Sequence, residues 1–306
     1  MTAITAAARA RMKKFTDEAE SRLRAAAVER VGAVGLPLPL KTGEQGELFQ
    51  PWHEPLRGLC NHFARAALFT ASHWKQPRER MGPTPLFTAE GFELVFSGEE
   101  LRQDDLDVWL QVVHFGRMTD VGQEFTVIPH TMLVALGWGR SKKDYNRLRE
   151  CVLRLKGAEV RIKDERIAPG RQLVTNLITE LRWDAEGKDD RAVWGLQLSK
   201  ALVTLYLPTN YSLVEWEQRL ALSPLAKWIH AFYSTHREPF PYSVAKLHAM
   251  CGSKNKRVAS FRLCLVDALN ELKQQKFLDG WEILKSRTEK AGVLNVTRTR
   301  FPKAAS

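Results

Sequence analysis

The residues best suited to binding chemistry in this chain are the arginines and lysines between Arg140 and Lys163. This segment reads RSKKDYNRLRECVLRLKGAEVRIK and holds nine basic residues against three acidic ones. A second segment, from Lys254 to Lys276, holds six basic and two acidic residues. The excesses of six and four charges in these segments account for ten of the net charge of +11. Clustered positive charge of this kind is typical of a surface that binds nucleic acid.

The type of each basic side chain indicates what it could contact. A guanidinium can donate two parallel hydrogen bonds to guanine, whereas an ammonium acts on a phosphate mainly as a point charge. The candidate base readers are Arg140, Arg147, Arg257 and Arg262, and the candidate phosphate contacts are Lys142, Lys143, Lys254 and Lys256. Ser260 could contact either group, Arg154 shares the outer stripe of Arg140, Lys143 and Arg147, and Arg161, Lys163 and Arg171 could reach the DNA backbone or minor groove. The alternative is that all these residues form solvated helix faces.

The elements around the first basic segment predict how its side chains are presented. Alternating apolar residues from Leu86 to Phe96 predict a strand pair, and Asp104-Asp105 opens a helix. A short helix starts at Pro129 and stops at Gly137, and the basic helix follows with an apolar stripe of Tyr145, Leu148, Val152 and Leu155. Strands through Val160 and Ile162, from Leu173 to Trp183 and through Trp194 to Leu198 complete this region. Helix, turn, helix and ribbon is the order of a winged helix, although a generic α+β domain would also fit.

The same order recurs in the last third of the chain. A helix begins at Ser223-Pro224, a short helix spans Ser243 to Met250, and the second basic helix follows Gly252. Its apolar stripe is Val258, Phe261, Leu265, Leu269 and Leu272, and strands from Phe277 to Ile283 and from Val293 to Thr297 form a ribbon. Measured from Gly137 and Gly252, Arg147 and Arg262 fall at the same offset. The sequence therefore predicts a duplicated unit.

The fold class that these patterns indicate is α+β, with two tandem winged-helix domains after a helical and flexible leader. We expect the leader at residues 1–61, the first winged helix at 62–200 and the second at 201–306. The leader contains a Gly- and Pro-rich linker in which Gln45, Leu48 and Phe49 have no local core to bury them. Such a peptide could insert its apolar pair into a preformed pocket of a partner. It could also fold back onto one of the domains.

Motifs for catalysis are missing from the sequence. There is no G-x-x-x-x-G-K-[ST] phosphate loop and no His-x-His pair. Asp104, Asp105 and Asp107 could bind a metal, but capping of the helix dipole is the simpler reading. The cysteines, Cys60, Cys151, Cys251 and Cys264, are too scattered to predict a disulfide framework or a zinc site. We expect a cytoplasmic protein that is not an enzyme, with no catalytic residue, cofactor, metal or membrane contact.

A set of short sequence words resembles the TrfA-type plasmid replication initiators. The words are RAALFT at 65–70, ELRQDD at 100–105 with VW at 108–109, LGW at 136–138, LSP at 222–224, HREPFP at 236–241, and CGS at 251–253 with RV at 257–258. They occur in order over residues 62–285. The Q-x-x-L-F pattern of Gln45, Leu48 and Phe49 also resembles the peptide that bacterial replication proteins insert into the sliding clamp, but Gly46 and Glu47 stand where the family tends to have Leu and Ser.

The resemblance implies a bacterial plasmid initiator with two winged helices and no enzymatic activity. Such proteins bind tandem direct repeats (iterons) in double-stranded origin DNA and help to open an adjacent A+T-rich segment, where single strands become available. They recruit the host initiator, helicase and sliding clamp, and a balance of monomers and dimers controls plasmid copy number.

Two other classes of protein remain as alternatives. A winged-helix transcriptional repressor could have the same fold, but two non-identical reading heads favour a direct repeat over a palindrome. An enzyme such as a primase or nickase is disfavoured by the missing nucleotide and metal motifs.

Overall fold

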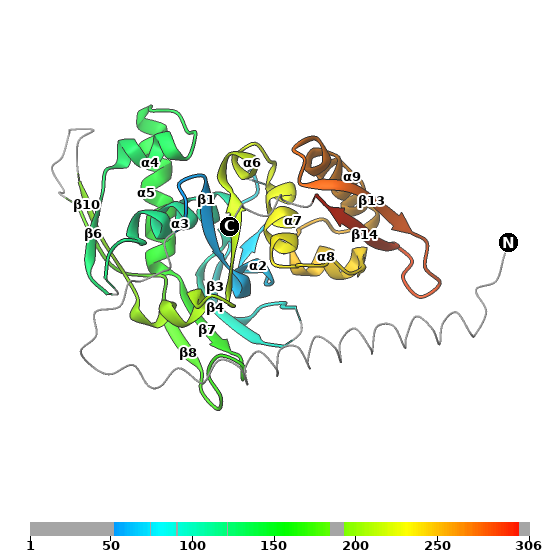
Figure 1. The fold of residues 1–306 in the computed structure, drawn as a ribbon, viewed down its shortest axis with the longest axis horizontal. Coiled ribbons are helices and arrows are strands. Elements are labelled where there is room, and N and C mark those ends of the chain that lie inside the picture. The colour runs from blue at the N-terminus through cyan, green and yellow to red at the C-terminus, as the bar shows by residue number, and fades with distance from the viewer. Residues whose placement is uncertain (1–51, 74, 90, 121, 184–192, 300–306) are drawn as a thin grey trace, which may run out of the picture. The chain divides into compact units, whose positions relative to one another are not determined.

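The structure is a computed structural model that describes residues 52–73, 75–89, 91–120, 122–183 and 193–299. The expected leader helix, the peptide residues Gln45, Leu48 and Phe49, and the expected polar loop after Trp183 lie outside the described residues. Helices and strands alternate throughout, so the chain is a mixed helix-and-sheet protein (Figure 1).

The elements follow one another in two stretches. The first contains β1 (Leu56–Cys60), α2 (Asn61–Ala64), β2 (Phe69–Thr70), β3 (Arg80–Pro85), β4 (Glu93–Glu99), β5 (Leu101–Arg102), α3 (Gln103–Gly116), β6 (Glu124–Val127), α4 (Pro129–Ala135), α5 (Lys142–Gly157), β7 (Glu159–Lys163), β8 (Leu173–Asn176), β9 (Ile178–Arg182), β10 (Trp194–Leu198), the 3-10 helix η1 (Lys200–Tyr206), β11 (Tyr211–Glu215) and α6 (Trp216–Leu220). The second contains α7 (Pro224–Ser234), β12 (Tyr242–Ser243), α8 (Val244–Met250), α9 (Val258–Gln274), β13 (Leu278–Leu284) and β14 (Val293–Arg298).

One succession of elements occurs twice. In the first stretch it is α3, β6, α4, α5, β9 and β10, and in the second it is α7, β12, α8, α9, β13 and β14. Each set forms a three-stranded antiparallel sheet in which the last strand lies between the other two, in the orders β6-β10-β9 and β12-β14-β13. The internal repeat that the sequence predicts is therefore present in the strand order as well as in the helices.

The ribbon directly after α5 is not the one that matches β13–β14. Strands β7 and β8 pair with β4 and β3 in a separate four-stranded sheet of order β3-β4-β7-β8. The hairpin at the equivalent position is β9–β10. Strands β7 and β8 are therefore an insertion between α5 and the three-stranded sheet. Arg161, Lys163 and Arg171 do not lie in the hairpin of that sheet, and their contact with DNA stays a prediction.

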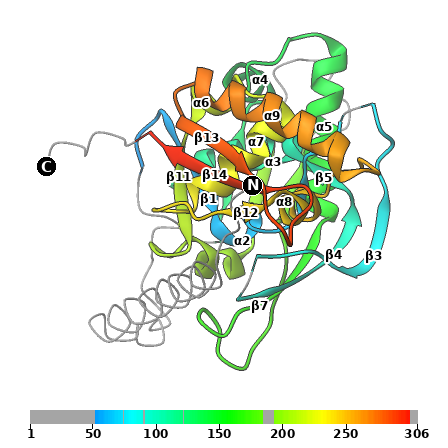
Figure 2. The same ribbon diagram turned by 90° about the vertical axis from the view of Figure 1, so that its right-hand side faces the viewer.

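Two clusters of buried apolar side chains hold these elements together. The first surrounds Trp109 of α3 and extends from Trp52 to Ala231 of α7. The second surrounds Trp228 and Phe232 of α7 and extends from Ala89 to Val296 of β14. In α5, Leu148, Val152 and Leu155 are buried and Tyr145 is partly buried, as the stripe in the sequence predicts. In α9, Phe261, Leu265, Leu269 and Leu272 are buried. The helix packs against β13, which pairs with β14 (Figure 2).

A pairing between distant segments closes the first cluster. Strand β1 pairs antiparallel with β11 from Leu56↔Glu215 to Cys60↔Tyr211. Helix α3 packs against both β1 and α5, so it lies beside the basic helix.

Candidate nucleic-acid interface

The turn between α4 and α5 sets the direction of the first basic helix. Gly137 has a φ of 65°, in the left-handed region that favours glycine, and it ends α4. A Cβ on Gly139 would lie 2.5 Å from the Asp144 carboxylate, so a larger residue here would displace the Asp144 side chain. Asp144 accepts from the backbone of Ser141 at 2.9 Å, and Ser141 accepts from the Asp144 amide at 3.4 Å. This capping box starts α5 two residues after the glycine turn.

The first turns of α5 present cations to solvent. Arg140, Lys142 and Lys143 are exposed, and Arg147 is 46% exposed. Lys142, Lys143 and Arg147 lie in α5, where Leu148 and Val152 are buried, and Arg140 lies in the turn before the helix. The arrangement offers several positive groups to one polyanionic surface.

Arg147 is held by two neighbours that the sequence did not reveal. Its guanidinium carbon lies 3.8 Å from the ring centroid of Trp138, in the turn before α5. Its Nη2 also donates to Oδ2 of Asp104, at the start of α3, over 3.4 Å. A stack on an aromatic face and a bond to a carboxylate restrict where the guanidinium can point.

The position of Arg154 differs from the prediction, which placed its side chain on the outer stripe of the helix with the candidate DNA contacts. Its side chain is only 9% exposed, and its Nε donates to Oδ1 of buried Asp105 over 2.9 Å. Arg78 donates to the other oxygen of Asp105 at 2.6 Å. Burial raises the pKa of Asp105, with a contribution from Asp104, although Arg154 and Arg78 oppose that rise. Arg154 thus neutralises a buried carboxylate and is not available to DNA.

The second basic segment is exposed over most of its length. Lys256, Arg257, Ser260 and Arg262 are exposed at and after the start of α9. Lys254 differs, because its Nζ lies 2.9 Å from Glu100 and 3.0 Å from Glu79, and its side chain is 27% exposed. Burial would raise the pKa of Glu100, but hydrogen bonds from Arg102, Lys254, Thr70 and Ser72 lower it to about 2. Lys254 therefore joins the second segment to the loops before α3, instead of standing free for a phosphate.

The buried residues of α5 and α9 align the two helices differently from the count that started at Gly137 and Gly252. Leu148 of α5 and Phe261 of α9 are the first fully buried residues of their stripes, and Val152 and Leu265 follow at the same spacing. Arg147 therefore corresponds to Ser260. Arg262 does not correspond to Arg147, and the next residue, Leu263, is 68% exposed. Residues at equal distances from Gly137 and Gly252 therefore do not lie on equivalent faces of α5 and α9.

The cations of β7 are partly paired. Arg161 lies 2.8 Å from Glu159 and Lys163 lies 3.7 Å from Glu93, while Arg171 is exposed in the loop before β8. These pairs are at the surface, where each contributes little to stability. Both cations remain partly accessible on the β3-β4-β7-β8 sheet.

The acidic cluster at the start of α3 has cationic partners. Asp104 pairs with Arg78 and Arg147, Asp105 with Arg78 and Arg154, and Asp107 with Arg219 and Lys227. Within the described ranges, no group of three or more His, Cys, Asp or Glu side chains is placed to hold a metal ion. Asp104 and Asp105 also lie in the first turn of α3, where the helix dipole favours acids.

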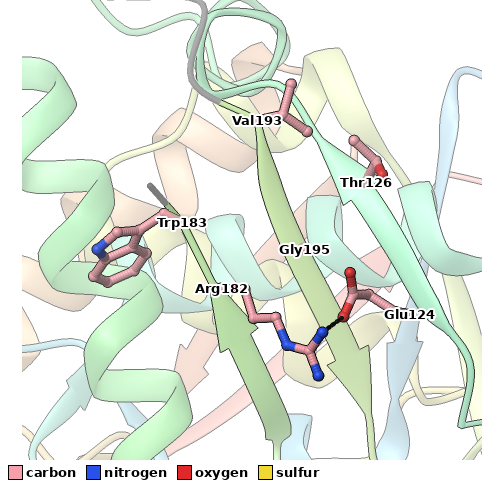
Figure 3. A pocket seen from close by; sticks show the side chains of 6 residues that line it. All are labelled: Glu124, Thr126, Arg182, Trp183, Val193 and Gly195. Carbon is pink, nitrogen blue, oxygen red and sulfur yellow. Dashed lines mark ion pairs between the residues drawn. The ribbon is translucent and has the colours of Figure 1, made fainter. Parts of the chain in front are cut away.

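A small surface pocket lies on the β6-β10-β9 sheet. It has a volume of about 230 Å³ and is lined by Glu124, Thr126, Arg182, Trp183, Val193 and Gly195 (Figure 3). Arg182 and Glu124 form an ion pair of 3.5 Å across it. Pockets for drug-sized ligands are typically larger, at about 300–1,000 Å³.

Solved structures show what kind of fold this is. A crystal structure of selenomethionine derivatives of domains 2 and 3 of RctB matches with a TM-score of 0.50 and 12% identity, over 77% of this chain and 97% of that chain. A second crystal structure of RctB domains 2–3 has a TM-score of 0.48 and 10% identity, over 74% of this chain and 94% of that chain. The first match shows a shared mixed helix-and-sheet fold.

The chain belongs to the TrfA family. The family model described as TrfA protein matches residues 44–283. The plasmid replication initiator protein TrfA of Escherichia coli is 30% identical over 225 residues, which are 73% of this chain and 58% of that relative. The resemblance seen in the sequence words is therefore confirmed, and the chain matches little more than half the length of this curated relative. None of the helices in the described ranges has the length and apolarity to span a membrane.

Proposed function

We propose that this protein is a plasmid replication initiator that binds double-stranded origin DNA through two winged helices. The single observation that carries the proposal is the repeated arrangement of α3–β10 and α7–β14, in which each set presents exposed cations, along α5 or at the start of α9, beside a three-stranded sheet. A helix of this kind fits the major groove, and the hairpin beside it can follow the backbone. Membership of the TrfA family supports replication initiation as the purpose of the binding.

Direct repeats are the form of DNA that suits this arrangement. The outer faces of α5 and α9 differ, since Arg147 corresponds to Ser260 and Arg154 to Asp267 when the buried stripes are matched. A chain with two unlike reading heads recognises an asymmetric site, and copies of that site are then arranged head to tail. We therefore expect one monomer to bind each successive iteron. Dimers would lower the concentration of free monomer and so limit plasmid copy number.

Footprinting on the DNA that flanks the reading frame tests the proposal. We expect tandem protected repeats beside an A+T-rich segment, with affinity falling roughly 10³-fold between 50 and 200 mM salt for about six phosphate contacts. A single protected promoter palindrome would instead support the alternative, a winged-helix repressor. An unprotected fragment with a flat salt response would overturn the DNA-binding proposal itself.

The proposal assigns the chemistry of replication to other proteins. The initiator opens the duplex and recruits the host initiator, helicase and sliding clamp, and it binds the exposed A+T-rich single strand. We infer no catalytic role and no cofactor for the chain, in the bacterial cytoplasm where plasmids reside. Purified protein should show no ATP hydrolysis or DNA nicking beyond that of a mock preparation, and activity that copurifies through successive columns would contradict this.

The peptide of Gln45, Leu48 and Phe49 is proposed as the sliding-clamp ligand. Changing Leu48 and Phe49 together to Ala should abolish binding to purified β clamp and leave DNA binding unchanged, because the apolar pair would fill a pocket on the clamp. Glu47→Ser is the matched gain variant, since it restores the residue that the family tends to have. Equal clamp titrations for the parent and the double variant would remove this assignment.

A further inference from the structure

Arg147 has an environment that no other residue among the predicted base readers has in the described parts of the chain. Its guanidinium lies against the Trp138 ring at 3.8 Å and donates from Nη2 to Asp104 at 3.4 Å. Asp104 is itself held by Arg78, which donates to its other oxygen at 3.0 Å. Arg140, Arg257 and Arg262 are exposed, and no ion pair or ring stack joins them to the described residues.

The geometry leaves Arg147 able to donate in its own plane. A guanidinium carries five N–H donors, of which the bond to Asp104 uses one on Nη2. The Trp138 ring covers one flat face but not the edge, and the side chain is 46% exposed. Four N–H groups therefore remain, and a planar acceptor such as the O6 and N7 edge of guanine needs two of them.

Asp104 makes a phosphate an unfavourable partner for the same guanidinium. A phosphate oxygen bonded to Arg147 would bring a second negative charge close to the Asp104 carboxylate, and the two negative charges would repel each other. A guanine edge carries no net charge and avoids that repulsion. Burial would raise the pKa of Asp104, but Arg78 and Arg147 outweigh it and lower the pKa, so the carboxylate stays ionised at neutral pH.

We propose that Asp104 and Trp138 are positioning residues that make Arg147 a guanine reader and exclude phosphate from it. This inference rests on the proposed function. It adds that sequence discrimination by α5 depends on Asp104, a residue of α3 outside the recognition helix. Arg154, seven residues further along α5, shows the contrast, because the fully buried Asp105 holds it inside the protein. Partial burial of Asp104 is what allows Arg147 to be oriented without being hidden.

The test is affinity selection from a randomised duplex library with the full chain and four variants. Asp104→Asn removes the repulsion and loosens Arg147, so binding to a scrambled duplex should rise several-fold while the ratio of selected to scrambled affinity falls about tenfold, with loss of guanine at one position. Trp138→Leu should lose the same guanine, and Trp138→Phe, which keeps an aromatic face, should retain it. A role that is merely structural would lower both affinities together.

Glu150→Gln is the matched control. It removes one exposed negative charge from α5 without contact to Arg147, so it should raise both affinities by the same factor and keep the guanine. If Asp104→Asn behaves like Glu150→Gln, or if Trp138→Leu selects the parental sequence, the positioning role is wrong while the proposed function stands. If the parent enriches no sequence at all, the proposed function itself is wrong, and this inference falls with it.

Discussion

The Arg219 guanidinium donates from Nε to Oδ1 of Asp107 over 2.8 Å, and both side chains are almost completely buried. Its Nη2 also donates to Gln103 at 3.0 Å, and Lys227 pairs with the other Asp107 oxygen. The contact joins α3, in the first apolar cluster, to α6 and α7. Burial lowers the pKa of Arg219, although Asp107 opposes that shift. A buried pair of this kind costs much desolvation, so its partners depend on each other.

Removing Arg219 should therefore be far more damaging than removing an exposed arginine. We expect Arg219→Met to lower the free energy of unfolding by about 3–5 kcal/mol, because Asp107 loses a buried partner. The exposed Arg237→Met should stay within about 0.5 kcal/mol of the parent. Urea denaturation of both variants checks this, and equal midpoints would show that Lys227 alone satisfies Asp107.

Stability should fall with acid through His114. Burial lowers the pKa of His114 to about 4, with help from Arg57 and Arg117 and against the hydrogen bond to Glu54. The unfolded chain binds this proton near pH 6.5, so the contribution is complete above that pH and is lost as the pH falls towards about 4.

His114→Asn isolates this titration. Trp52 donates to Nδ1 of His114 at 3.0 Å, and the Asn carbonyl can accept that bond. The slope of unfolding free energy against pH between about 6.5 and 4 should decrease by at most about 1.4 kcal/mol per pH unit. His236, whose pKa burial also lowers to about 4, keeps part of the slope in the variant. Parallel curves for the parent and His114→Asn would contradict the prediction.

Helices α5 and α9 allow a matched pair of leucine tests. Leu148→Ala and Leu265→Ala each truncate a fully buried side chain and should cost about 2–5 kcal/mol. Leu153→Ala and Leu263→Ala make the same change on the exposed sides of α5 and α9, at 47% and 68% exposure, and should cost little. Melting curves that fail to separate buried from exposed variants would mean that the helices are rotated.

Both reading heads should contribute to specific DNA binding. Arg147→Ala and Arg257→Ala are each expected to cost about 1–3 kcal/mol on the selected duplex and to relax different positions of it. Lys200→Ala removes an exposed cation outside both basic segments and serves as the control. Folded variants that bind like the parent would dismiss the corresponding helix as a reader.

Periodicity in the sequence identified the elements that amphipathic patterns encode. The stripe of Leu148, Val152 and Leu155 placed α5 correctly, and Gly137 marked the end of α4, because helix spacing and left-handed glycine are local properties. The ion pairs of Arg154 and Lys254, in contrast, are not determined by local sequence. Asp105 and Glu100, which bind them, lie 49 and 154 residues away along the chain, and no spacing rule connects such partners.

Strand partners were equally hidden. A ribbon after α5 was evident from Val160 and Ile162, but its pairing with β4 depends on which sheet edge is free in three dimensions. The stack of Trp138 on Arg147 had a weak signal, since an aromatic residue stood between two glycines beside a basic helix.

The pairing of β1 with β11 has a consequence for synthesis on the ribosome. Strand β1, which begins at Leu56, can pair with β11 only after Glu215 has been synthesised. At bacterial elongation rates of about 5–20 residues per second, that interval is roughly ten to thirty seconds. During it the nascent chain carries a strand with an open edge, which nascent-chain chaperones would have to shield from other growing polypeptides.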